Sequence, residues 1–158
     1  MEAELNLRIV LETPPAGVDF GLQSGKGNDY ETIHKQRSRG KDLAFDFAVT
    51  VKNNRSDGLP NFLGPFAQGP LTNRFIYIDV GQYAGQADSI WARRIKVPLT
   101  GIDWELINEA KEPKTVLETR FPGTGKDGGP TCASVRGVRW TLTKKTKAAP
   151  AVNRASRG

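Results

Sequence analysis

The side chains best able to bind a ligand or move a proton lie close together in the middle of the chain, between Arg74 and Arg94. Two carboxylates in this segment, Asp79 and Asp88, flank a polar loop that is punctuated by glycine. If the two carboxylates approach each other, repulsion between their negative charges raises the pKa of one of them, so that it stays protonated. The pair can then act as acid and base. The alternative is structural: Asp79 points outward from a strand and Asp88 caps a turn.

Two adjacent arginines, Arg93 and Arg94, open the next strand after this loop. Neighbouring residues on a strand point to opposite faces, so only one of the two can be directed toward the core side. A half-buried arginine needs an anionic partner. That partner is either Asp79 or Asp88, or the carboxylate or phosphate of a ligand. In the second case the loop adds neutral hydrogen bonds to the ligand from Gln82, Tyr83 and Gln86.

A second candidate site is the glycine-rich turn at residues 122–130, which carries Lys126. Successive backbone N–H groups beside a lysine can hold an anion. The turn is not a Walker phosphate loop, because that pattern needs a glycine where Arg120 stands and Ser or Thr where Asp127 stands. The alternative to anion binding is a plain connection between two strands.

The chain has a single histidine and a single cysteine, which leaves few residues for nucleophilic catalysis or for a metal site. His34 is the only histidine, and it lies among basic residues, so we expect an exposed strand or loop residue. Cys132 is the only cysteine, so an intrachain disulfide is impossible, and we expect a small core residue. We expect no metal site and no cofactor. The single thiol favours a reducing compartment.

The formal net charge of +6 is concentrated at the C-terminal end. From Arg136 onward the chain has seven basic residues and no acidic one, whereas the first 135 residues are close to neutral. Residues 144–158 have almost nothing large to bury, so we expect a disordered basic tail after a single domain at residues 1–143. No run of residues approaches the roughly 20 apolar positions that a membrane span needs. We therefore expect a soluble cytoplasmic protein.

Alternating apolar and polar residues predict the strands that would position these side chains. Two patterns are the clearest, at residues 5–11 and 43–51, and weaker strands are expected at 30–37, 75–80, 95–99, 116–121 and 132–143. Pro98 places its strand at a sheet edge or ends it early. Residues 17–40 otherwise read as glycine-rich and polar, with a loop at 23–29, and residues 53–69 as irregular, with Phe62 and Phe66 available to pack on the core.

A short helix is predicted at Asp103–Ala110, with Asp103 as its N-cap and Pro113 just beyond its end. Many Gly and Pro residues and one short helix favour β architecture. We predict a mainly antiparallel, all-β fold, either a β-sandwich or a partly closed barrel, of about seven or eight strands.

Five segments together resemble a family of small uncharacterised bacterial proteins. They are Pro15–Gln23, Gly64–Pro70, Arg74–Gly81, Tyr83–Asp88 and Pro122–Pro130, and the resemblance covers about residues 3–136. It implies a bacterial source and a self-contained domain. Because the family is one of unknown function, the resemblance brings no activity, cofactor or catalytic residue, and the basic tail lies outside it.

Three functions follow from these features. The leading hypothesis is a non-catalytic module that binds a small anionic ligand or a protein partner through the segment Arg74–Arg94 and the adjacent glycine-rich loops. The alternative is a small hydrolase or isomerase that uses Asp79 or Asp88 as its base and an arginine to hold an anionic substrate. The third is an accessory whose tail binds nucleic acid or an anionic membrane surface, weakly and with strong salt dependence.

Overall fold

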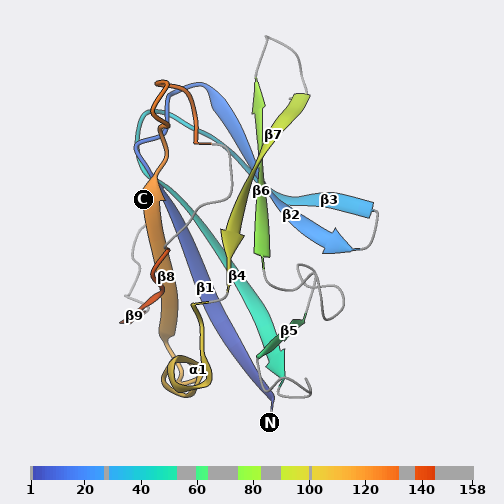
Figure 1. Cartoon of the computed structure of the whole chain (residues 1–158), viewed down its shortest axis with the longest axis vertical. Coiled ribbons are helices and arrows are strands. Elements are labelled where there is room, and N and C mark those ends of the chain that lie inside the picture. The colour runs from blue at the N-terminus through green and yellow to red at the C-terminus, as the bar shows by residue number, and fades with distance from the viewer. Residues whose placement is uncertain are drawn as a thin grey trace.

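The part of the chain that the computed structural model describes folds into two β-sheets and one short helix (Figure 1). The structure describes residues 2–26, 29–52, 60–63, 75–82, 90–99, 101–131 and 138–144. The strands in these ranges are β1 (Glu2–Glu12), β2 (Val18–Lys26), β3 (Asp29–Arg37), β4 (Leu43–Lys52), β5 (Asn61–Leu63), β6 (Phe75–Gln82), β7 (Ile90–Pro98), β8 (Thr115–Pro122) and β9 (Thr141–Lys144).

The strands divide between a five-stranded sheet, in the order β5-β4-β1-β8-β9, and a four-stranded sheet, in the order β3-β2-β6-β7. Every strand pair is antiparallel except β1 with β8, which run parallel with Leu7 opposite Leu117. The expectation of a mainly antiparallel fold therefore holds, with one parallel pair that the sequence pattern did not reveal.

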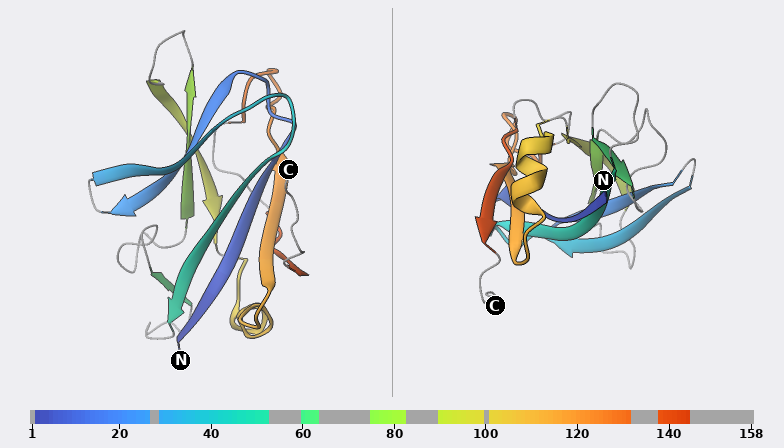
Figure 2. Two further views of the ribbon diagram at one scale, coloured as in Figure 1. Left: turned by 180° about the vertical axis from the view of Figure 1, so that it is seen from behind. Right: turned by 90° about the horizontal axis from the view of Figure 1, so that it is seen from below.

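Apolar side chains from the inner faces of both sheets make one core. In β1, Leu5, Leu7, Ile9 and Leu11 are buried, and they pack with side chains of the second sheet such as Phe20 and Ile78 in a single cluster. This arrangement is a β-sandwich. The described strands share no hydrogen-bonded edge between the two sheets, so the barrel alternative is not realised. Figure 2 shows the two sheets from behind and from below.

Two strands occupy stretches that the sequence pattern predicted to be irregular. Strand β2 runs through residues 18–26, where we expected a polar glycine-rich connection, and its Phe20 and Leu22 are fully buried. Strand β5 is short and lies within the expected irregular stretch at 53–69. It pairs with the end of β4 and buries Phe62, as predicted, whereas Phe66 lies outside the described residues.

The helix α1 (Trp104–Ala110) forms where it was predicted, and Asp103 accepts a hydrogen bond from the backbone N–H of Leu106 at 2.9 Å. Ile107 and Ala110 face the core. Within the described part of the chain no helix is long and apolar enough to cross a membrane. Of the last predicted strand, at 132–143, residues 138–140 are not in a strand and β9 begins at Thr141, while residues 132–137 lie outside the described residues. Cys132 and residues 145–158 lie outside the described residues.

Candidate functional site

The two adjacent arginines of β7 point to opposite faces of the four-stranded sheet. Arg94 lies opposite Asp79 in the β6–β7 ladder, and Arg93 lies opposite Val80, next to a β-bulge in β7. Val80 is a core residue, whereas Asp79 belongs to the outer face. The alternation of one strand therefore sends Arg94 to the outer face and Arg93 to the inner side, near one end of the sandwich.

Arg94 is held by the protein itself. Its Nε donates to Asp79 Oδ1 at 2.7 Å, and its guanidinium lies over the ring of Tyr77, 4.9 Å from the ring centre. The side chain of Asp79 is 11% exposed and that of Arg94 is 36% exposed. A mostly buried carboxylate needs such a partner. Of the two partners considered for a half-buried arginine, a carboxylate of the protein or an anionic ligand, Arg94 therefore has the first.

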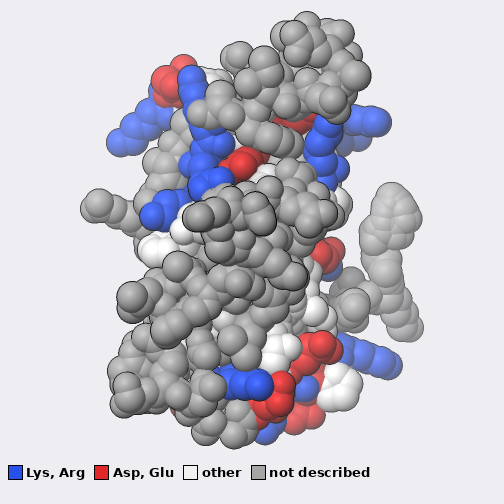
Figure 3. All heavy atoms as spheres, turned by 90° about the vertical axis from the view of Figure 1, so that its right-hand side faces the viewer, with Lys and Arg blue, Asp and Glu red and all other residues white. Residues whose placement is uncertain are grey.

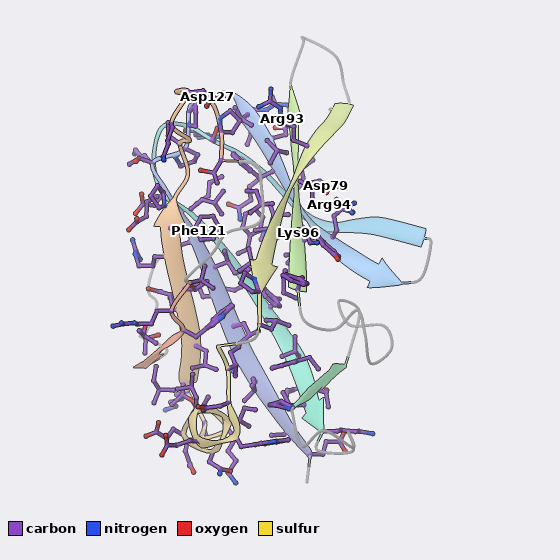
Figure 4. The ribbon with its side chains drawn as sticks, viewed as in Figure 1. Asp79, Arg93, Arg94, Lys96, Phe121 and Asp127 are labelled. Atoms are coloured by element: carbon purple, nitrogen blue, oxygen red, sulfur yellow. The ribbon has the colours of Figure 1, made fainter. Side chains whose placement is uncertain are left out.

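Arg93 lines a cavity of about 320 Å³ at one end of the sandwich. The other described residues that line it come from β2, β6 and the glycine-rich turn after β8, namely Val18, Val80, Gly81, Asp127, Gly129 and Pro130. Figure 4 shows Arg93 and Asp127 at the same end of the molecule, on different elements. The structure thus brings together two segments that the sequence offered as separate candidate sites.

The turn at residues 122–130 has a defined fold. The backbone N–H of Gly125 donates to Gly129 O at 2.7 Å, and that of Gly128 donates to Gly125 O at 3.0 Å. The carboxylate of Asp127 accepts from the N–H of Gly129 at 3.0 Å. Gly128 has a φ of +85°, a conformation that favours glycine. The turn therefore presents Asp127 and Gly129 to the cavity in a set geometry.

Strand β2 carries, next to Val18 of the cavity wall, an ion pair that the sequence pattern did not reveal. Asp19, next to Val18, is fully buried and receives Arg37 through Nε at 2.7 Å and Nη2 at 3.1 Å. Lys35 Nζ lies 3.8 Å from the same carboxylate. The hydrogen bonds from Arg37 lower the pKa of Asp19 below its ordinary value, although burial acts in the opposite direction. The spacing of Lys35 and Arg37, two apart on β3, was the signal available in the sequence.

Charges of both signs lie near each other elsewhere on the surface as well. Figure 3 shows acidic and basic side chains next to one another near the top and near the bottom of one side of the molecule. On the outer face of the five-stranded sheet, Arg8 pairs with Asp46 at 2.6 Å, and Arg120 pairs with Glu12 at 3.2 Å and with Asp42 at 3.1 Å. These contacts stabilise neighbouring strands.

The remaining predicted site residues are placed as follows. Lys126 is exposed on the turn and is not among the residues that line the cavity. Gln82 ends β6, and its side chain lies outside what the structure describes, as do Tyr83, Gln86 and Asp88.

His34 is exposed on β3, as predicted, and its ring meets Phe45 edge to face with 5.4 Å between ring centres. Among the described residues, no group of three or more His, Cys, Asp or Glu side chains is placed to hold a metal ion.

Residues 5–143 match the model of a family described as a family of unknown function, DUF5990. The chain belongs to the DUF5990 family. The DUF5990 match takes in both arginines of β7, the glycine-rich turn and every described residue that lines the cavity, and it leaves out residues 144–158. No curated protein matches the chain, and no solved structure does. The earlier resemblance to an uncharacterised family is thereby confirmed, and the family's description carries no activity to transfer.

Proposed function

We propose that this DUF5990 domain is a non-catalytic binding module and that it takes a small ligand with an anionic group in the cavity at Arg93. The observation that carries the proposal is the meeting of Arg93 with the glycine-rich turn around one cavity of about 320 Å³. Ligand pockets usually have volumes of about 300–1,000 Å³, with mostly apolar walls and a few polar groups that orient the ligand. This cavity has that composition.

The walls and the charge have separate roles in this proposal. Val18, Val80 and Pro130 supply apolar surface, and Arg93 supplies a planar guanidinium whose geometry suits a carboxylate or phosphate. Arg93 is exposed, so water competes for its charge and we expect modest affinity.

The rival hydrolase or isomerase is less well supported, because its described base candidate lies elsewhere. Asp79 is engaged by Arg94 on the outer face of the sheet, and it is not among the residues that line the cavity with Arg93. An active site built on Asp79 would need Arg94 to release it. We therefore favour binding over catalysis.

The test is a thermal-shift screen of the full chain against small carboxylates, phosphates, sugars and nucleotides, with two variants that differ by one position. A ligand that binds only the folded state at 100 times its Kd stabilises it by about 2.7 kcal/mol, which such a screen detects. Arg93→Ala should abolish the shift that the ligand causes, measured against the unfolding temperature of the same variant without ligand.

Arg94→Ala is the matched control. It should keep the ligand-induced shift but lower the unfolding temperature, because it leaves the carboxylate of Asp79 mostly buried without its arginine. We expect a loss of about 1–2 kcal/mol, below the usual 3–5 kcal/mol for a fully buried pair, since Arg94 is partly exposed. If both variants kept the shift, or if no compound stabilised the wild type, the proposal would be wrong.

We further propose a bacterial, cytoplasmic protein, as the family resemblance and the single cysteine suggest. A protein partner at the same end of the sandwich is the alternative to a small ligand. The tail accessory is tested separately: if it is right, deletion of residues 144–158 should remove retention on heparin or on anionic lipid vesicles. Unchanged retention would exclude that role.

A further inference from the structure

We infer that the ligand of the Arg93 cavity is amphoteric: it carries a carboxylate for Arg93 and a cationic group for Asp127. This inference rests on the proposed function and narrows its ligand class. Among the described residues that line the cavity, two are charged; they have opposite signs and come from different elements, Arg93 from β7 and Asp127 from the turn after β8. Figure 4 shows them near the same end of the sandwich.

Asp127 changes what the cavity selects. A ligand with only negative charge gains from Arg93 and loses to Asp127, and a ligand with only positive charge meets the reverse situation. A molecule with both charges gains from each residue. The opposing charges therefore act against singly charged compounds while favouring a zwitterion, which is how binding sites achieve discrimination.

Asp127 keeps the capacity to bind a ligand although it also serves the turn. Its Oδ1 accepts from the backbone N–H of Gly129 at 3.0 Å. A carboxylate has about four acceptor positions, so one backbone hydrogen bond leaves others for an ammonium group. Asp127 and Arg93 are both exposed, which puts the two charges at the solvent side of the cavity and the apolar Val80, a buried residue, on its inner wall.

The size of the cavity limits the ligand to a small molecule. Its volume of about 320 Å³ is at the lower end of the range for ligand pockets. A short ω-amino acid has the required features, namely two opposite charges joined by a few methylene groups that can lie against Val18 and Val80. The chemical class we assign is therefore a small amino acid or a compound of the same charge pattern.

The test compares probes that differ only in their charged ends. Glycine, 3-aminopropionate and 4-aminobutyrate are titrated into the full chain at pH 7 and low salt, each beside the plain carboxylate of the same carbon number. The longest amino acid, 4-aminobutyrate, is also compared with butylammonium, which carries the positive charge alone. Low salt matters because exposed charges are screened within about 10 Å at 0.1 M. At least one amino acid should bind threefold or more tightly than its matched carboxylate and, for the longest, than the amine.

Asp127→Asn is the decisive variant, because an asparagine oxygen can still accept from Gly129 while the negative charge is gone. It should bind the carboxylates at least as well as the wild type does and lose the preference for amino acids. Arg93→Ala should weaken both kinds of probe.

Three results would overturn the inference. Equal binding of amino acids and carboxylates by the wild type would leave the proposed function standing with a simple anion as ligand. If Asp127→Asn kept the preference for amino acids over carboxylates and only unfolded at a lower temperature, Asp127 would stabilise the turn without contacting the ligand. Failure of every probe that carries a carboxylate to bind would overturn this inference alone, because the proposed function also allows a phosphate and is judged by the thermal-shift screen.

Discussion

Replacement of Thr119 by valine should stabilise the protein. Thr119 lies on the core side of β8, opposite Ile9 of β1, and is fully buried. Among the described residues its hydroxyl is the one buried side-chain oxygen without a hydrogen-bond partner. A buried polar group left in this state costs about 1–3 kcal/mol, and valine has nearly the same shape without the hydroxyl. We therefore expect Thr119→Val to raise the free energy of unfolding by about 1–3 kcal/mol.

The assay is urea denaturation together with calorimetry. For a chain of this size, each kcal/mol raises the unfolding temperature by about 2–4 °C, so the shift should be a few degrees to about 10 °C. The urea m-value should stay constant, which would show that the change lies in stability and not in the unfolded state.

The same substitution at Thr115 is the matched control. That residue begins the same strand, and its hydroxyl donates to Ala110 O at 2.6 Å. Thr115→Val should therefore destabilise the protein by about 1 kcal/mol. If Thr119→Val were also destabilising, the reasoning would be refuted, because the hydroxyl of Thr119 would then have a partner such as a buried water molecule.

Two further predictions concern the pair behind the cavity wall and the base of the turn. The pKa of Asp19 is lowered in the folded state mainly by Arg37, so its contribution to stability is present above the ordinary value of about 3.9 and is lost as pH falls through the lowered value. Asp19→Asn should cost about 1–2 kcal/mol near pH 7, and the difference from the wild type in a pH series of unfolding temperatures should shrink below pH 4; a constant difference would count against the pair. Gly123→Ala should cost about 1–3 kcal/mol in a urea titration, because the new methyl group would lie 2.8 Å from Pro14 Cβ. Gly101→Ala, whose methyl would meet its nearest neighbour at 3.6 Å, should be close to neutral, and equal losses in both variants would contradict this explanation.

The strands that could be predicted from the sequence are those in which apolar and polar residues alternate without interruption. Strand β4 alternates clearly, with Phe45, Val49 and Val51 buried, and it forms where expected. Strand β2 was missed because Asp19 and Gly21 occupy its outer face, and both residue types are uncommon in strands. The burial of Asp19 is made possible by Arg37 on the neighbouring strand, and such a contact has no local signature in the sequence.

The candidate site was predictable in its parts but not in its assembly. Alternation along β7 implied that Arg93 and Arg94 face opposite ways, and the Gly-rich composition implied a turn at residues 122–130. The sequence did not show which arginine would meet Asp79, since this depends on the strand register and on the bulge of β7 opposite Val80 and Gly81. Nor did it show that the turn after β8 would reach the end of the other sheet.

The parallel pairing of β1 with β8 delays the completion of the first sheet during synthesis. β1 lies in the interior of this sheet, but one of its two neighbours is made more than a hundred residues later, and the salt bridge between Glu12 and Arg120 spans 108 positions. Contacts that join such distant segments slow folding. Until β8 leaves the ribosome, one edge of β1 has unpaired backbone groups, which can pair with other chains. A nascent chain that stops before residue 115 therefore exposes an unpaired edge of β1, where aggregation can begin.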